Sequence, residues 1–191
     1  MPDYDAIVIG AGNGGLTAAV TLAQRNQKVL LLEQHNIPGG CATSFVRGRF
    51  EFETSLHQLS GLGTEDNPGP LRGTFGKLGI LDKLEFVQDE YLYRSVISDK
   101  CDIRLKANRS ETVETLKSNF PQESASIDKF FDFVWELMMQ YLSVVILRDP
   151  ELSKSKYPLY TKYAFRKTSE VLDEFFEDPN LKTVLGSYWG Y

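Results

Sequence analysis

The chain has 191 residues, of which 42% are hydrophobic and 25% are charged, and its net charge is −5. These proportions are those of a globular protein and exclude a disordered or fibrous chain. The 21 basic and 26 acidic residues are spread so that no third of the chain is strongly basic, which argues against nucleic-acid binding. Cys41 and Cys101 belong to no Cys/His ligand set, so we expect neither a metal site nor a disulfide framework.

The first predicted elements form one continuous pattern. A short apolar strand at residues 5–9 runs into a glycine-rich turn, Gly10–Gly15, and then into a helical apolar pattern at 16–23. A second apolar strand at 28–33 ends in Glu33. Strands that are apolar throughout are typical of a parallel sheet covered on both faces. The order strand, glycine turn, helix, strand and acid is the dinucleotide fingerprint and predicts a Rossmann-like βαβ unit.

Each part of this fingerprint has an expected task. Gly10 allows the tight turn, Gly12 lets the backbone approach a pyrophosphate, and Gly15 lets the helix pack against the strand. The N-terminus of the helix offers free N–H groups to the phosphates. Glu33 would accept hydrogen bonds from the ribose hydroxyls, and its charge would repel the 2′-phosphate of NADP. A tight βαβ turn without any ligand is the alternative interpretation.

The fingerprint by itself does not separate FAD from NAD. Two features favour FAD: the motif lies at the start of the sequence, and a second glycine pair, Gly39 and Gly40, follows Glu33 closely. This pair lies in a turn cluster at 38–44 where the backbone could again approach the cofactor, although an ordinary turn has the same composition. The residues expected to bind the cofactor are Gly10, Ala11, Gly12, Asn13, Gly14, Gly15, Glu33, Gln34, Gly39, Gly40 and Thr43.

The segment from Gly39 to Gly61 reads GGCATSFVRGRFEFETSLHQLSG. It resembles the phytoene desaturase superfamily of FAD-dependent oxidoreductases, in which paired glycines precede a Thr/Ser-Phe, a short hairpin and a Phe-Glu-Phe-acid run. The position of His57 after that run is similar to the carotenoid isomerase and retinol saturase branch. Weaker similarity continues at the helix start around 119–127 and at 178–190. The resemblance implies FAD as cofactor, an apolar polyene as substrate, and desaturation, saturation or isomerisation as reaction.

Three positions depart from the family pattern. Asn26 stands where a glycine often precedes the second strand, and Cys41 stands where many flavoproteins have an arginine near the pyrophosphate. Both departures would loosen cofactor contacts. Thr54-Ser55 replaces the usual Asp/Thr-Gly pair, which bears on His57, the one catalytic candidate. A proton relay and a structural, hydrogen-bonded role both remain open for His57.

Beyond the motif, short strands are expected at 84–87, 91–98 and 101–106, together forming a small antiparallel meander. Ser110 is the expected N-cap of a helix with acidic residues in its first turn. We therefore expect an α/β chain with two portions: an FAD-binding Rossmann-like portion with an incomplete parallel sheet at 1–83, and a mixed, mainly helical part of a substrate domain at 84–191.

The most apolar stretch, 130–147, has one narrow polar stripe, formed by Asp132, Glu136, Gln140 and Ser143. Its two carboxylates argue against a transmembrane span. Either it is a helix buried in the substrate domain, or one face contacts lipid or an apolar substrate. The following segment, 148–167, interleaves six basic residues with aromatic ones. It is either a solvated loop with packed tyrosines or an interfacial membrane anchor.

Only two strands look like parallel core strands, whereas a typical sheet has about five or six. Members of the family that the chain resembles are also more than twice as long. We therefore expect the N-terminal portion of a longer or split enzyme, with the remainder or a C-terminal chain as its partner. The alternative function is a non-catalytic dinucleotide-binding or interaction module. Because the first strand begins almost at once, no signal peptide is expected, and the expected location is the cytoplasm, with peripheral membrane contact through 130–167.

Overall fold

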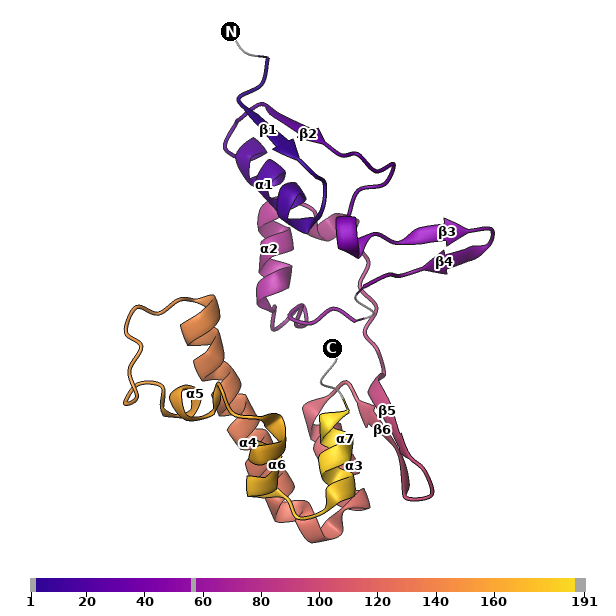
Figure 1. The fold of residues 1–191 in the computed structure, drawn as a ribbon, viewed down its shortest axis with the longest axis vertical. Coiled ribbons are helices and arrows are strands. Elements are labelled where there is room, and N and C mark those ends of the chain that lie inside the picture. Colours follow the sequence, from indigo (N-terminus) through magenta and orange to yellow (C-terminus); the bar gives the residue numbers. More distant parts are fainter. Residues whose placement is uncertain (1–2, 56–57, 188–191) are drawn as a thin grey trace. The chain divides into compact units, whose positions relative to one another are not determined.

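The computed structural model describes residues 3–55 and 58–187. The chain divides into two compact units, 1–86 and 87–190, which are described one at a time (Figure 1).

Unit 1 begins with the predicted βαβ unit. Strand β1 (Ala6–Ile9), helix α1 (Asn13–Ala23) and strand β2 (Val29–Leu32) follow in that order. The two strands are parallel, with Ala6 opposite Val29 and Ile9 opposite Leu32. Between α1 and β2, Asn26 has a φ of 61°, in the left-handed region. This conformation explains why glycine suits the position, and asparagine is among the residues that tolerate it best.

The expectation that both faces of this sheet are covered is wrong for the described chain. Val8 faces α1, since a methyl group added at Gly15 would lie 3.5 Å from its side chain. Ile7 and Ile9 project from the other face and are 60% and 84% exposed. Successive side chains of a strand point to opposite faces, so one helix covers only one of them.

The rest of unit 1 contains a hairpin and a helix. A 3₁₀ turn (Gly40–Ala42) leads into antiparallel strands β3 (Phe45–Arg47) and β4 (Phe50–Phe52), which confirms the expected hairpin. Helix α2 (Pro70–Leu78) and a 3₁₀ turn (Leu81–Lys83) follow. The strand expected at 84–87 is not formed. Phe86 instead stacks on Phe75 of α2, with 6.1 Å between the ring centroids. Val87 is 83% exposed. This segment therefore packs through an aromatic contact and not through strand pairing.

Unit 2 opens with an antiparallel hairpin of β5 (Tyr91–Ile97) and β6 (Cys101–Lys106). Both strands match the expected ranges, but the meander has two strands rather than three. Helix α3 (Arg109–Asn119) is capped by Asn108 and not by Ser110. The Asn108 side chain accepts a hydrogen bond from the Glu111 N–H at 3.2 Å, which places Ser110 inside the first turn.

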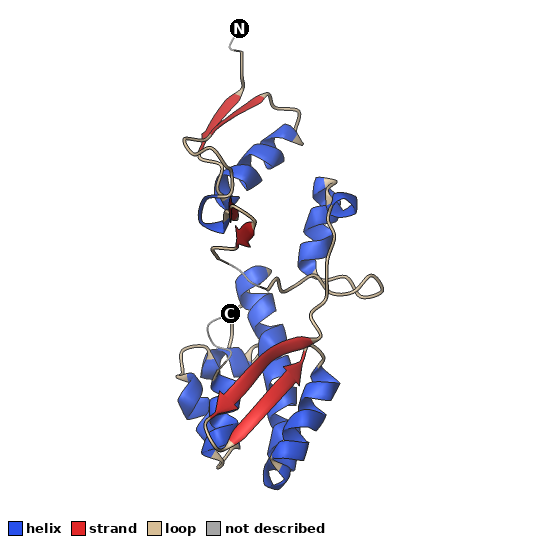
Figure 2. Cartoon of the chain, turned by 90° about the vertical axis from the view of Figure 1, so that its right-hand side faces the viewer, coloured by secondary structure: helices blue, strands red, loops and turns tan. Residues whose placement is uncertain are grey.

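The remaining elements of unit 2 are helical. They are α4 (Ser124–Tyr141), a π-helical turn (Leu142–Ile146), α5 (Pro158–Tyr163), α6 (Thr168–Phe175) and α7 (Pro179–Gly186). The β5–β6 hairpin lies against one side of these helices (Figure 2). None of the helices in the described residues is long and apolar enough to cross a membrane.

The hydrophobic core belongs to unit 2. Its buried side chains come from β6, α3, α4, α6, α7 and the connections that follow α3 and α6, and are Ile103, Leu105, Leu116, Phe120, Ile127, Leu172, Phe176, Leu181 and Val184. In the described part of unit 1, Ala11 is the buried hydrophobic residue. The two units therefore differ in how much apolar surface they bury by themselves.

Helix α4 is only partly buried. Its N-terminal half reaches the core through Ile127, whereas the apolar residues of its C-terminal half are largely exposed, Trp135 to 61%. The interpretation of 130–147 as a buried helix is therefore wrong for its outer face within the described chain. The expected polar stripe is present along the helix, with Gln140 accepting hydrogen bonds from the N–H groups of Leu159 and Tyr160 at 3.0 Å each.

Candidate cofactor site

The first turn of α1 is open to solvent at the end of β1. The Gly10 N–H donates to the Leu32 carbonyl at 2.7 Å, which ties the end of β1 to β2. Gly12 is the extended N-cap, no side chain caps the helix, and no acidic residue lies in its first turn. An uncapped helix N-terminus presents N–H groups and a positive dipole end, so it can bind an anion such as a pyrophosphate.

Gly15 is required by the packing of α1 on β1. A Cβ atom at this position would lie 1.8 Å from the Gly10 carbonyl oxygen, far closer than a real Cβ contact. The absence of a side chain therefore lets the helix begin directly against the strand, which is the role expected for this glycine.

Glu33 follows β2 and is bound to the glycine turn. Its Oε2 accepts a hydrogen bond from the Ala11 N–H at 2.5 Å, and its Oε1 accepts one from the His35 N–H at 2.9 Å. Both bonds lower the pKa of Glu33 below its usual value, the His35 bond more strongly. The carboxylate is thus ionised and oriented, and each oxygen keeps acceptor capacity for a hydroxyl group. The bond to Ala11 was missed by the sequence reasoning, which gave Glu33 a ligand role only.

The second glycine pair meets the first glycine turn. The Gly39 N–H donates to the Ala11 carbonyl at 2.7 Å, and Gly39 pairs with Gly12 in a parallel bridge. Gly40 has a φ of 61°, and a Cβ atom on it would lie 3.1 Å from Gly12 Cα. A side chain at Gly40 would therefore press on the backbone at the start of α1. The turn at 38–44 is part of the site's framework and not an independent loop.

Two threonines hold this turn in place. Thr43 Oγ1 donates to the Pro38 carbonyl at 3.1 Å, so its hydroxyl supports the turn from within. Thr54 Oγ1 donates to the Thr43 carbonyl at 2.7 Å and lies 3.2 Å from the Cys41 carbonyl. Thr54, which the sequence marks only as a departure from the family pattern, thereby links the end of the β3–β4 hairpin to the turn that follows the glycine pair.

The structure brings some of the residues singled out in the sequence together and leaves others apart. The turn Gly10–Gly15, Glu33 and the Gly39–Gly40 pair are joined by the contacts above. Gln34 is exposed next to Glu33, and Cys41 carries an exposed free thiol. His57, the catalytic candidate, lies outside the described residues. Within the described part of the chain, no three His, Cys, Asp or Glu side chains are grouped as a metal site would need.

Comparison with known proteins gives one domain match and two kinds of relative. Residues 8–69 match the model of an NAD(P)-binding Rossmann-like domain. All-trans-retinol 13,14-reductase is 28% identical in Danio rerio, over 98% of this chain and 33% of the relative, and 33% identical in Macaca fascicularis, over 95% and 31%. The chloroplastic prolycopene isomerase of Daucus carota is 30% identical over 89% of this chain and 26% of the relative. The chain thus spans about a third or less of the length of these relatives.

The matches cover both units. The Rossmann-like match contains the glycine turn, β2 and the second glycine pair, and the retinol reductases and prolycopene isomerases align with nearly the whole chain. They confirm the family resemblance in the sequence. The chain has a Rossmann-like dinucleotide-binding fold, and over nearly its whole length its sequence is similar to carotenoid and retinol oxidoreductases.

Proposed function

We propose that the chain forms the FAD-binding part of an oxidoreductase that acts on a polyene such as a carotenoid or a retinoid. The observation that carries this proposal is the meeting of three groups in unit 1: the uncapped N-terminus of α1, the ionised Glu33 and the Gly39–Gly40 pair. The names of the relatives, a retinol reductase and a prolycopene isomerase, support the substrate class.

The residues present fit the adenosine diphosphate portion of FAD. The open first turn of α1 would hold the pyrophosphate, and the free acceptor capacity of Glu33 would hold the ribose hydroxyls. Gly12 and Gly40 lie so close that a side chain on Gly40 would crowd the place where the pyrophosphate approaches the backbone. The second glycine pair is what favours FAD over NAD, and the charge of Glu33 disfavours a 2′-phosphate.

When bound, a flavin supplies the hydride transfer to or from the polyene. The residues of this chain supply binding and orientation. Glu33 fixes the ribose and, through the Ala11 N–H, the glycine turn itself. The dipole of α1 offsets the charge of the pyrophosphate. In this proposal unit 1 binds the cofactor and unit 2 is part of the substrate domain, while His57 stays a weak catalytic candidate.

A titration of the purified chain with FAD, followed by flavin fluorescence, tests the proposal. We expect FAD to bind and Glu33→Gln to weaken binding by about tenfold or more, because a hydrogen bond to a charged acceptor is lost. Glu85→Gln is the matched control, since Glu85 is an exposed acid of unit 1 without a partner in the described residues. Equal FAD affinities for all three proteins would refute the assignment of the ribose to Glu33.

The exposed face of β1 favours a second candidate function. Ile7 and Ile9 leave an apolar sheet face open in the described chain, as expected of a module that pairs with another polypeptide. The alternative is therefore a dinucleotide-binding or interaction module without activity of its own. A chain that binds FAD and converts a polyene supports the enzyme, whereas a chain that binds a partner protein and shows no turnover supports the module.

A further inference from the structure

Helix α4 has two apolar faces with different surroundings. Phe130 and Phe133 face the protein and contact Phe175 of α6 at ring-centroid distances of 5.3 and 4.9 Å. On the outer face, Trp135, Met138 and Met139 are 61%, 48% and 47% exposed. A surface helix normally places polar residues on the side away from its core, so this outer face departs from the amphipathic pattern.

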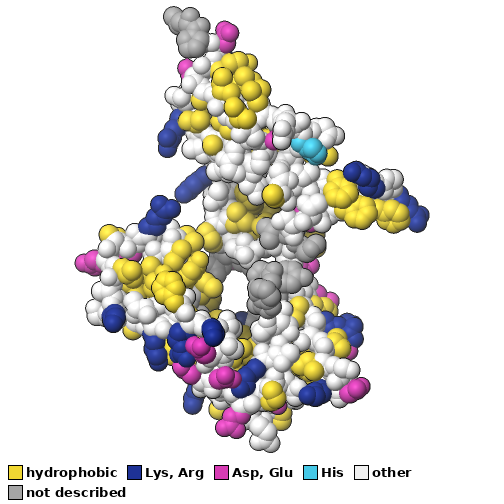
Figure 3. All heavy atoms as spheres, in the orientation of Figure 1, with side chains coloured by type: hydrophobic (Ala, Val, Ile, Leu, Met, Phe, Trp, Pro, Cys, Tyr) yellow, Lys and Arg dark blue, Asp and Glu magenta, His cyan; other side chains and the backbone are white. Residues whose placement is uncertain are grey.

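The apolar surface continues past the end of the helix. Ile146, the last residue of the π-helical turn, and Leu147 after it are 57% and 77% exposed, and Leu152 in the next loop is 55% exposed. We call the six side chains the apolar tip; they are Trp135, Met138, Met139, Ile146, Leu147 and Leu152. Figure 3 shows hydrophobic side chains gathered over this end of α4, with basic side chains at the border of the patch. Contiguous apolar surface of this kind marks a contact with a protein or a membrane.

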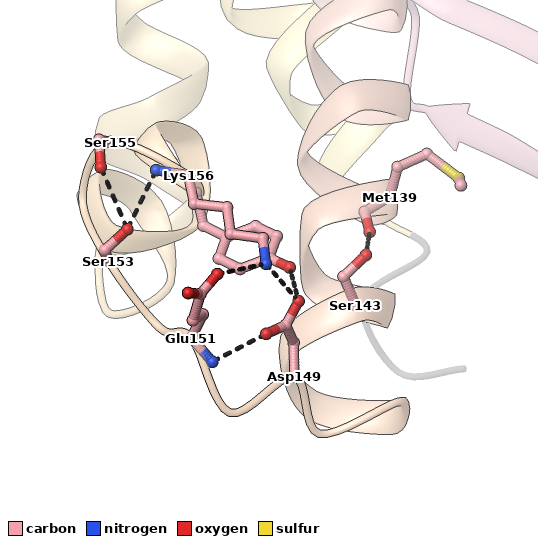
Figure 4. Close-up of polar contacts among 8 residues, drawn as sticks. Met139, Ser143, Asp149, Glu151, Ser153, Ser155 and Lys156 are labelled. Atoms are coloured by element: carbon pink, nitrogen blue, oxygen red, sulfur yellow. Dashed lines mark hydrogen bonds and ion pairs between the residues drawn. The ribbon is translucent and has the colours of Figure 1, made fainter.

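The loop that carries part of the apolar tip is held by a polar network (Figure 4). Asp149 Oδ2 accepts from the Tyr157 hydroxyl at 2.5 Å and from Lys156 Nζ at 2.9 Å, and Oδ1 accepts from the Glu151 N–H at 2.8 Å. The Asp149 N–H donates to the Ser143 carbonyl at 3.1 Å, which anchors the loop to the π-helical turn. The loop next to the tip is therefore ordered, and the Asp149 carboxylate in it is engaged in hydrogen bonds within the loop.

The charges next to the apolar tip are mainly positive. Residues 148–167 hold six basic and two acidic side chains, in a chain whose net charge is −5. Lys156 is paired with both of these acids. Arg148, just before the paired loop, and Lys154, within it, are exposed and form no ion pair with any described residue. Exposed aliphatic and tryptophan side chains flanked by unpaired cations are the pattern of a surface that inserts among anionic lipid headgroups.

We propose that the apolar tip, flanked by Arg148 and Lys154, docks on an anionic lipid surface. The apolar side chains enter the headgroup region, and the two cations stay at the level of the phosphates, as long basic side chains do. The proposal goes beyond the cofactor-binding function, because the tip lies wholly in unit 2 and its contacts involve no cofactor. Exposed cations without ion pairs beside an apolar surface match the phosphate and serine headgroups of an anionic membrane, which is why we assign the tip to lipid.

Cosedimentation of the full chain with phosphatidylcholine vesicles, with and without phosphatidylserine, tests this proposal. We expect binding to the phosphatidylserine vesicles that weakens with salt, and little binding to phosphatidylcholine alone. Arg148→Gln with Lys154→Gln should lower the partition coefficient by about 25-fold, since each basic residue near an anionic surface contributes about fivefold. The matched control is Lys100→Gln with Lys129→Gln, which removes the same charge from exposed positions of unit 2 away from the tip.

A second variant probes the apolar part. Ile146→Ser with Leu147→Ser changes exposed side chains only, so the circular dichroism spectrum of this variant should match that of the parent. Each CH₂ group lost from the membrane-buried surface should weaken vesicle binding by about fourfold. We therefore expect the vesicle binding of the double variant to fall by about tenfold or more. The chain has two tryptophans, so a Trp189→Phe background makes Trp135 the reporter. We expect its emission to shift to shorter wavelength on phosphatidylserine vesicles.

Each other outcome overturns the proposal. Equal binding to both kinds of vesicle, or equal loss in the control pair, removes the role of the two cations. A dimer in analytical ultracentrifugation that the tip variants dissolve, without vesicle binding, assigns the surface to a second copy of the chain. Because FAD titration measures unit 1 separately, failure of lipid binding is distinguishable from failure of the proposed cofactor site.

Discussion

Gly14 and Gly15 are neighbours in the first turn of α1, yet the structure predicts opposite responses to the same added methyl group. A Cβ atom on Gly14 meets nothing within 4 Å. One on Gly15 would lie 1.8 Å from the Gly10 carbonyl oxygen, and real contacts are essentially never below 3.0 Å. Because this oxygen belongs to the backbone, no change of side-chain rotamer relieves the clash, and α1 must move away from β1.

The size of the difference follows from two known effects. Overpacking costs about 1–3 kcal/mol, and a tolerated glycine-to-alanine change stabilises by about 0.4–1 kcal/mol. We expect Gly15→Ala to be less stable than Gly14→Ala by about 1.4–4 kcal/mol. Amide hydrogen exchange of α1 measures this locally, because protection reports the free energy of opening of that helix. In Gly15→Ala we expect both the protection of α1 and the affinity for FAD to fall. Equal protection of α1 in the two variants would refute the packing argument.

The other predictions concern unit 2. Ile127 is fully buried, so Ile127→Ala should lower the free energy of unfolding by about 2–5 kcal/mol in urea denaturation, whereas Val96→Ala, at a position 62% exposed, should change it by no more than about 0.5 kcal/mol. The pKa of Asp149 is lowered from 3.8 to about 2 by hydrogen bonds from Tyr157 and Lys156. A lowered folded-state pKa stabilises the fold above the unfolded pKa, and this stabilisation is lost as the pH falls through about 2. The stability of the parent chain should therefore fall more than that of Asp149→Asn between pH 3.8 and about 2, and parallel curves would contradict the network in Figure 4.

Much of the fold could be predicted because its signals are local. The apolar runs of β1 and β2, the glycine turn after β1 and the helical pattern of α1 occur within 33 residues of sequence. The structure forms β1, α1 and β2 where they are expected. The hairpin of β5 and β6 was predicted for the same reason. Where two local signals compete, the sequence misled: asparagine and serine are both good N-caps, and in the structure Asn108 rather than Ser110 caps α3.

The sequence by itself determined the Rossmann-like start of the chain, the order of its elements and the position of its glycine turn, because periodicity and turn chemistry act between near neighbours. Tertiary structure alone decided that Glu33 binds Ala11, that Thr54 braces the turn at 38–44, and that the outer face of α4 is open to solvent in the described chain. Each of these depends on groups far apart in the chain coming within hydrogen-bonding distance, or on a surface lacking a neighbour. No local pattern encodes such distances, since they are set by how the elements pack together.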